Sequence, residues 1–225
     1  MNNLKVIAHI RTEFPEKFGV PRQSGLIPGL TGRIVFEPEY RSRDALKGIE
    51  EFTHLWILWE FEGVPTENFN ATVRPPRLGG NETKGVFATR SPFRPNPIGL
   101  SSVKLERVEE TAEGPVPVVS GIDMRDNTPI FDIKPYLAYA DSHPEASNGF
   151  AEEKRNDELE VVFPKDLLQV FEPERQSNII EILKQDPRPH YQEDPERIYG
   201  VAYAGKNVRF KVCGKTLTVV EINRK

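Results

Sequence analysis

Short runs of alternating apolar and polar residues, joined by irregular turns, most limit what this chain of 225 residues can fold into. Such runs are typical of half-buried strands. In the first 140 residues they cover 4–10, 31–36, 52–61, 100–108, 117–124 and 130–133. Neither a GxGxxG motif nor an alternation of strands with helices is present. The sequence therefore predicts an N-terminal antiparallel β-barrel rather than a doubly wound sheet.

Local details add to this prediction. The range 52–61 is apolar on both faces, so we expect a strand that is covered on both sides. A short helix is expected at 40–49, closed near Gly48, and an extended segment at 85–88. In the turn that precedes Ile130, Asn127 is the residue best able to take a positive φ.

A different pattern follows the barrel. Residues 141–160 are polar and lose all periodicity, which predicts a linker. Helices are expected at 165–171 and 173–185, and strands at 199–203, 208–212 and 217–222. We therefore expect a mainly β protein with an α+β appendage: a barrel domain at 1–140, a linker at 141–160 and a small C-terminal domain at 161–225.

Composition narrows the class of protein. Apolar residues make up 37% and charged residues 28% of the chain, and no apolar stretch is long enough to cross a bilayer. The first residues do not form a secretory signal. A single cysteine, Cys213, excludes an internal disulfide and a CxxC metal site. These features predict a cytoplasmic protein that does not associate with a membrane.

Charge is unevenly distributed, although the net charge is only −4. The range 72–107 holds seven basic and two acidic residues, a net charge of +5. The range 140–175 holds four basic and ten acidic residues, a net charge of −6. A basic surface is compatible with a polyanionic partner even in an acidic chain.

The basic range contains a loop, residues 85–100, with three prolines, two arginines and two glycines. Each proline fixes its own φ and restrains the residue before it. Arg90 and Arg94 are thereby set on a stiff frame, and a guanidinium suits carboxylate or phosphate. This pattern favours a ligand clamp, although a proline-rich cap on a sheet edge is the alternative.

Other catalytic chemistry finds little support. The four histidines are scattered without metal-ligand spacing, so no metal is expected, and no serine lies in a GxSxG motif. Two short turns remain, Pro21-Arg22-Gln23 and Asp126-Asn127-Thr128. With Arg90 they would recognise an amino-acid or nucleoside group. Taken alone, Pro21-Arg22-Gln23 is equally compatible with an ordinary turn, and the range 126–129 favours an ordinary turn.

Several motifs together carry a family resemblance. They are the Pro21-Arg22-Gln23 turn and the ranges 52–57, 73–80, 85–100, 126–129 with 132–136, and 186–189. In these motifs the chain resembles the TsaA-like (TrmO) family. The resemblance implies an S-adenosylmethionine-dependent methyltransferase that acts on N6 of threonylcarbamoyladenosine beside the anticodon of tRNA. It also implies a barrel that forms a homodimer, a cofactor near the subunit interface and a C-terminal domain that holds tRNA.

The resemblance also implies site residues. Glu62 and Gly63 stand where the family often has His-Gln, and Asn127 where it often has glycine. Arg74, Arg94 and Arg188 are expected to contact the substrate, and Asp126 is a weak candidate for the catalytic base. The expected cofactor contacts are Pro21, Arg22, Gln23, Glu62, Gly63, Arg90, Leu100, Asp126, Asn127, Thr128 and Pro129.

Two other functions remain open at this point. A barrel that binds S-adenosylmethionine or a nucleotide and regulates a partner without catalysis needs the same cofactor clamp. A methyltransferase that acts on another acceptor also fits the clamp. The Asp186-Pro187-Arg188-Pro189 motif favours the tRNA enzyme, because a sensor does not need a part that holds tRNA.

Overall fold

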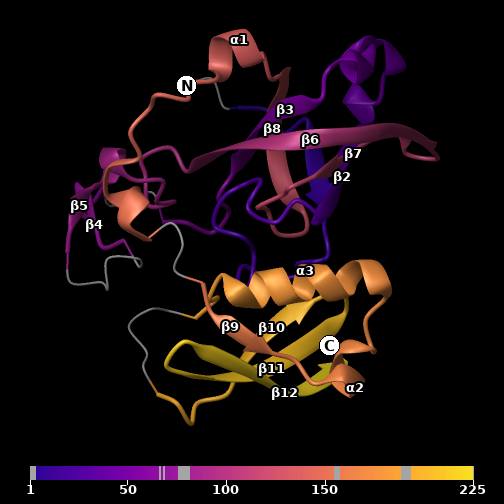
Figure 1. The fold of residues 1–225 in the computed structure, drawn as a ribbon. Coiled ribbons are helices and arrows are strands. Elements are labelled where there is room, and N and C mark those ends of the chain that lie inside the picture. The colour runs from indigo at the N-terminus through magenta and orange to yellow at the C-terminus, as the bar shows by residue number, and fades with distance from the viewer. Residues whose placement is uncertain are drawn as a thin grey trace.

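Two large sheets make up most of the protein, and a helix lies between them (Figure 1). The computed structural model describes residues 4–65, 67, 69–75, 82–154, 158–188 and 194–224. The N-terminal sheet contains six strands. They are β1 (Ala8–Arg11), β2 (Thr31–Phe36), β3 (His54–Glu60), β6 (Ile98–Thr111), β7 (Gly114–Ser120) and β8 (Thr128–Pro135).

These six strands close into a barrel in the order β1-β2-β7-β6-β3-β8, because β8 pairs with β1. Every pairing in this sheet is antiparallel. In β3 the alternate residues Leu55, Ile57 and Trp59 are buried, while the residues between them are exposed or half-buried. Contrary to the sequence prediction, β3 is fully covered on one side only, because its other side chains point away from the barrel core.

The C-terminal sheet has the order β10-β11-β12-β9, with bounds Tyr199–Tyr203 (β10), Lys206–Cys213 (β11), Thr216–Arg224 (β12) and Glu160–Val162 (β9). The first three strands are antiparallel, and β9 runs parallel to β12. Helices α2 (Lys165–Leu168) and α3 (Pro173–Lys184) precede β10. The two predicted helices and three predicted strands of this region are confirmed, although α2 is shorter than expected and β9, which begins at the end of the predicted linker, was not predicted.

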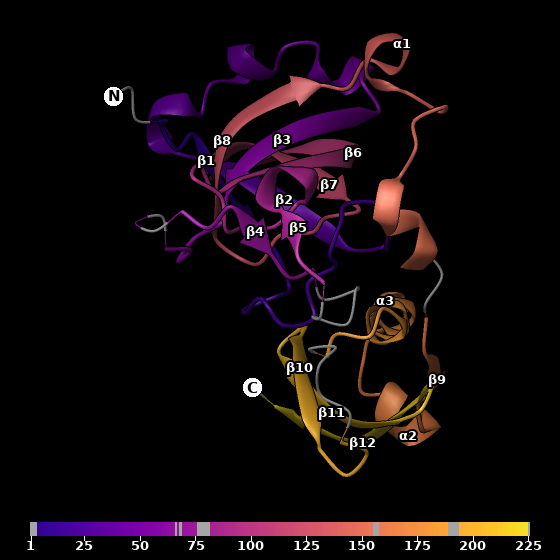
Figure 2. The same ribbon diagram turned by 90° about the vertical axis from the view of Figure 1, so that its left-hand side faces the viewer.

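Helix α3 fills the space between the two sheets, and Figure 2 shows it nearly end-on there. Its Arg175 forms an ion pair with Glu13, with an Nε to Oε1 distance of 2.7 Å. The Asn178 side-chain amide donates to the carbonyl of Gly29 over 3.0 Å. A Cβ atom at Gly29 would lie 2.2 Å from Asn178 Oδ1, so only glycine allows this close approach.

Two local predictions are wrong. In place of the helix at 40–49, the chain makes three 3-10 turns, η1 (Pro38–Tyr40), η2 (Arg43–Leu46) and η3 (Ile49–Glu51). Gly48, with φ +85°, interrupts any continuous helix there. The expected extended segment at 85–88 is strand only at its first residue and then forms the 3-10 turn η5 (Val86–Ala88).

Short elements occupy the remaining connections. A hairpin of β4 (Thr72–Val73) and β5 (Lys84–Gly85) stands beside the barrel. Helix α1 (Ala138–Asp141) and the 3-10 turn η6 (Gly149–Lys154) lie in or next to the predicted linker. Among the residues that the structure describes, no helix combines the length and the apolar character needed to span a bilayer.

Candidate functional site

Two of the predicted motifs meet at one place. The guanidinium of Arg90 donates a hydrogen bond to the side-chain carbonyl of Gln23. The side-chain nitrogen of Gln23, Nε2, in turn donates to the backbone carbonyl of Arg22 over 2.5 Å. The two side chains are 67 positions apart, on the loop that follows β1 and on the proline-rich loop before β6. The barrel therefore brings the proline-rich loop and the Pro21-Arg22-Gln23 turn together.

Directly next to this contact lies Asp123, which the sequence did not indicate as a site residue. The Ser101 hydroxyl donates to Asp123 Oδ1 over 2.6 Å, and Trp59 Nε1 donates to the same hydroxyl over 2.8 Å. Burial raises the pKa of Asp123 to about 6, against the opposing effects of the Ser101 hydrogen bond, backbone hydrogen bonds and the positive charge of Arg90. An acidic residue in the apolar run 121–124 was the only available signal.

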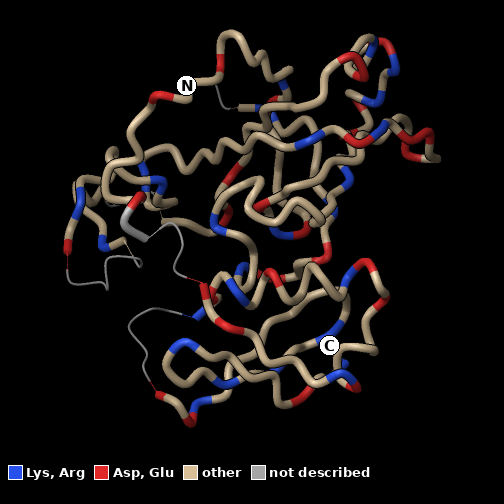
Figure 3. Tube along the Cα trace, viewed as in Figure 1, with Lys and Arg blue, Asp and Glu red and all other residues tan. Residues whose placement is uncertain are grey.

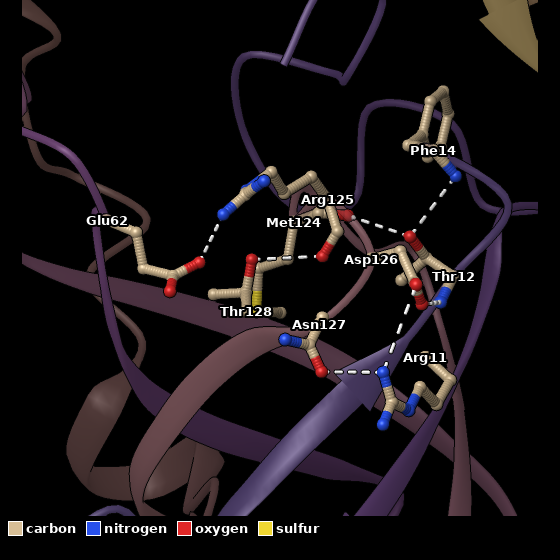
Figure 4. Close-up of polar contacts among 9 residues, drawn as sticks. All are labelled: Arg11, Thr12, Phe14, Glu62, Met124, Arg125, Asp126, Asn127 and Thr128. Atoms are coloured by element: carbon tan, nitrogen blue, oxygen red, sulfur yellow. Dashed lines mark hydrogen bonds and ion pairs between the residues drawn. The ribbon is translucent and has the colours of Figure 1, made fainter. Parts of the chain in front are cut away.

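The second predicted turn, 126–128, is held by hydrogen bonds to Arg11 and Thr12 at the end of β1 and to Arg125 beside it (Figure 4). Asn127 has φ +63°, as its residue type predicted, and its side-chain oxygen accepts from Arg11 over 2.6 Å. Asp126 Oδ1 accepts from the amide of Thr12 over 2.9 Å. Thr128 is buried, and its hydroxyl donates to the carbonyl of Arg125. These side chains stabilise the shape of the turn.

Glu62 is linked to this turn, because Arg125 forms an ion pair with it (Figure 4). The carbonyl of Glu62 also accepts from Lys17 Nζ over 2.7 Å. Gly63 has φ +69° and open space around its Cα. Pro129 is buried in β8, where it lies opposite His9 of β1.

Leu100 lies on β6, and 54% of its surface is exposed. Its neighbour Gly99 lies against the ring of Trp59, where an added Cβ would come within 2.2 Å of a ring carbon. Ser101 follows Leu100 on the same strand and is buried, so the exposed Leu100 side chain lies on the opposite face of β6, where it offers an apolar surface.

Arg22 connects the site to the C-terminal region. Its Nη2 donates to the carbonyl of Asp186 over 3.0 Å. Arg188 forms a two-pronged ion pair with the Asp186 carboxylate, over 2.8 and 2.9 Å, and its side chain is only 13% exposed. The ion pair between Arg188 and Asp186 fixes the loop that follows α3, in which Asp186 has φ +45°. Pro189, the last residue of the motif, lies outside the described residues.

The remaining predicted substrate residues differ in their surroundings. Arg94 Nη1 donates to the carbonyl of Thr89 over 2.8 Å and approaches those of Val86 and Ser91, so it braces the proline-rich loop from inside. Arg74 is exposed at the end of β4. Figure 3 shows several basic positions at the β4–β5 hairpin and the segment that follows it. The motif residues 76–80 lie outside the described residues.

Chemically, the meeting point of the two loops offers a guanidinium and an amide, with a buried carboxylate nearby. In the parts of the chain that the structure describes, no group of three or more histidine, cysteine, aspartate or glutamate side chains is placed to hold a metal ion. A surface hollow of about 500 Å³ lies elsewhere, between residues 5–6 and 37–40. It shares no residue with the predicted site.

Comparisons with known proteins identify the family. Residues 9–142 match the tRNA-methyltransferase O N-terminal domain, and residues 156–225 match the TrmO C-terminal domain. The tRNA (adenine(37)-N6)-methyltransferase of Escherichia coli K12 is 42% identical over 92% of this chain and 91% of that protein. A protein of Eikenella corrodens with the same name is 45% identical over 72% of this chain and 91% of its own length.

Solved structures agree with this result. A crystal structure of TrmO from Pseudomonas aeruginosa superposes with a TM-score of 0.76 at 31% sequence identity, over 99% of both chains. A relative from the same organism, 40% identical over 89% of this chain and 88% of its own length, is named as a proposed S-adenosylmethionine-dependent methyltransferase. The resemblance in the sequence motifs is thereby confirmed. The chain belongs to the tRNA-methyltransferase O family of S-adenosylmethionine-dependent tRNA methyltransferases.

Proposed function

We propose that this protein methylates N6 of threonylcarbamoyladenosine at position 37 of tRNA, with S-adenosylmethionine as methyl donor. Relatives along nearly the whole chain are named tRNA (adenine(37)-N6)-methyltransferases. The observation that carries the proposal for this chain is the contact between Gln23 and Arg90, which joins the two motifs expected to hold the cofactor.

The residues at this contact fit the cofactor. Arg90 suits the carboxylate of its methionine part, and Gln23 and backbone groups of the loop suit its hydroxyl and base groups. Leu100 offers apolar surface. The walls of the cofactor site would be formed by Arg22 and by the turn 126–129, with Glu62 and Gly63 beside this turn. Contacts within the protein already hold these residues in place. Pro21 precedes Arg22 and stiffens the loop.

When bound, S-adenosylmethionine supplies a methyl group on a sulfonium centre that already contains the leaving group. The task of the protein is then to hold N6 of the base in line with that methyl group and to accept one proton. Asp126 is the weak candidate for the base. One of its carboxylate oxygens already accepts from Thr12, and the other lies 4.0 Å from Arg11, so its role in the turn competes with proton transfer.

The threonylcarbamoyl group ends in a carboxylate that an arginine would recognise. Arg74 is exposed on the β4–β5 hairpin and is the best placed of the three candidates for direct contact. Arg94 would act by keeping the loop in shape, and Arg188 by fixing the C-terminal loop, because both guanidinium groups are already engaged within the protein.

The proposal includes a division of labour along the chain. Residues 1–140 would bind the cofactor and perform methyl transfer, 141–160 would link, and 161–225 would hold tRNA. A homodimer is proposed because large apolar side chains are exposed around the site, at Phe69, Phe87, Phe93 and Leu100. Light scattering should then give twice the chain mass. A cytoplasmic location is part of the proposal, because the proposed substrate is tRNA.

Labelled transfer tests the function directly. The protein is incubated with methyl-labelled S-adenosylmethionine and total tRNA, and the tRNA is digested to nucleosides. We expect the label in N6-methyl-threonylcarbamoyladenosine, and none when the tRNA comes from cells unable to make threonylcarbamoyladenosine. Label in another nucleoside would identify a different acceptor, and cofactor binding without transfer would support the regulatory alternative.

Replacing Arg90 by alanine should weaken binding of S-adenosylmethionine by about 10- to 100-fold, the equivalent of one hydrogen bond to a charged group. Isothermal titration calorimetry measures the dissociation constant. Arg209→Ala is the matched control, because Arg209 is paired with Glu221 on the C-terminal sheet, away from the two loops. Equal affinities of the Arg90→Ala variant and the unchanged protein would contradict the proposed site.

A further inference from the structure

Asp123 is an acidic residue in an apolar segment. Its neighbours Gly121, Ile122 and Met124 are all buried, and the segment leads from β7 into the turn 125–128. Most of the Asp123 carboxyl group is shielded from water, although the residue as a whole is only half-buried. A carboxylate in such a place is unfavourable unless its hydrogen bonds and charge partners compensate for lost hydration.

Three parts of the site converge on this carboxyl group. From β6, the Ser101 hydroxyl donates over 2.6 Å, and it is itself oriented by Trp59 Nε1. From the loop after Gln23, the backbone amide of Ser24 donates to Asp123. From the proline-rich loop, the charge of Arg90 acts on it. Ser24 is tied to β6 a second time, because its hydroxyl accepts from the amide of Ser102 over 3.2 Å.

These contacts connect the interior of the barrel to the Gln23 and Arg90 pair. Among the described residues, the guanidinium of Arg90 donates to the neutral side-chain carbonyl of Gln23, and the negative charge of Asp123 adds an electrostatic attraction without direct contact. An exposed arginine held by one neutral acceptor samples many rotamers, and a fixed charge beneath it reduces that freedom. Pre-ordering the guanidinium lowers the entropy that is lost when a ligand binds.

We propose that Asp123 is a positioning residue, whose buried charge holds Arg90 and the Ser24 end of the cofactor loop in the arrangement that binds S-adenosylmethionine. The inference rests on the proposed cofactor site and adds a residue that acts through Arg90. The proposal predicts opposite effects of the Asp123 charge on cofactor affinity and on folding stability. The charge favours cofactor binding, while its burial opposes folding.

The pH dependence follows from the same geometry. Because burial raises the pKa of Asp123 to about 6, the native protein holds this proton at a pH where the unfolded chain has released it. Folding stability should therefore fall as the pH rises from about 4 to about 6. Cofactor affinity should rise as the carboxylate forms. Arg90 is the charged group that acts on Asp123, and the Ser24 amide and Ser101 hydroxyl are neutral donors.

The test compares Asp123→Asn with the unchanged protein in cofactor titrations and thermal unfolding. At pH 7.5 the variant should bind S-adenosylmethionine about tenfold more weakly, yet unfold at the same or a higher temperature. At saturating cofactor, kcat on tRNA should be nearly unchanged, because the loss is in binding. Between pH 5 and 7.5 the affinity of the unchanged protein should rise, and that of Asp123→Asn should stay flat.

Two further variants make the outcome decisive. Ser101→Ala keeps the charge and removes one donor, so it should weaken cofactor binding less than Asp123→Asn does. Asp44→Asn changes an exposed aspartate of η2 and should alter neither property. Unchanged cofactor affinity in Asp123→Asn, or an unfolded Asp123→Asn protein, would overturn the inference. If the unchanged protein itself fails to bind S-adenosylmethionine, the proposed cofactor site fails instead.

Discussion

Replacing Phe14 by alanine is expected to destabilise the protein by about 3–5 kcal/mol, the usual cost of deleting a buried aromatic side chain. Phe14 follows β1, is only 1% exposed and packs on the ring of Tyr203 from the C-terminal sheet, with 5.2 Å between ring centroids. Its carbonyl also accepts from the amide of Asp126 over 2.7 Å. One side chain thus supports the contact between the two sheets and lies beside the candidate site.

Thermal unfolding measures the effect of Phe14→Ala. For a chain of this size the midpoint should fall by roughly 6–20 °C, since each kcal/mol corresponds to about 2–4 °C. Tyr139→Ala is the control, because Tyr139 in α1 is 89% exposed and its removal should change stability by less than about 0.5 kcal/mol. A Phe14→Ala midpoint that matches the control would show that the two sheets do not depend on this contact.

Replacing Gly99 by alanine should destabilise the protein by about 3 kcal/mol, at the upper end of the cost of overpacking a core. The added Cβ would lie 2.2–2.5 Å from three carbons of the Trp59 ring, which is rigid and 6% exposed. The ring would have to move, and with it the Nε1 group that donates to Ser101. The variant should therefore also weaken cofactor binding, which calorimetry would detect.

Gly85→Ala is the matched control for this substitution. Gly85 lies in β5 with φ −58°, and a Cβ atom there would meet no atom within 4 Å. The same chemical change at this position should leave the unfolding midpoint within about 1–2 °C of the unchanged protein. Equal midpoints for Gly99→Ala and Gly85→Ala would mean that the Trp59 ring is not confined as the structure indicates.

Elements with a clear period were predicted well. The strand at Thr31–Phe36 was placed correctly at both ends, and all three antiparallel strands of the C-terminal sheet were found. An alternating pattern reports which side chains face a core, and this information is local. The positive φ of Asn127 was also predictable, because few residue types other than glycine tolerate that conformation.

Predictions that depended on distant contacts did worse. The range 40–49 reads as a helix, yet its apolar residues pack on the barrel in separate 3-10 turns. Arg94 and Arg188 were expected to contact the substrate, and this stays a prediction; the structure adds that nearby backbone carbonyls and Asp186 already bind their guanidinium groups. Residue type states what a side chain is able to bind, whereas the partner that it finds within the chain depends on packing.

From sequence alone, the strand pattern, the stiffness of the proline-rich loop, the basic character of the range 72–107 and the family resemblance could be determined, because each depends on residues close together in the chain. Tertiary structure decided that Gln23 meets Arg90 and that Asp123, which accepts from Ser101, lies within reach of the charge of Arg90. It also decided that Arg22 reaches the C-terminal loop. Each of these contacts joins segments far apart in the chain. The closure of the barrel brings together the segments that hold Gln23, Arg90 and Asp123, and the packing of α3 against the loop that joins β1 to β2 brings Asp186 to Arg22.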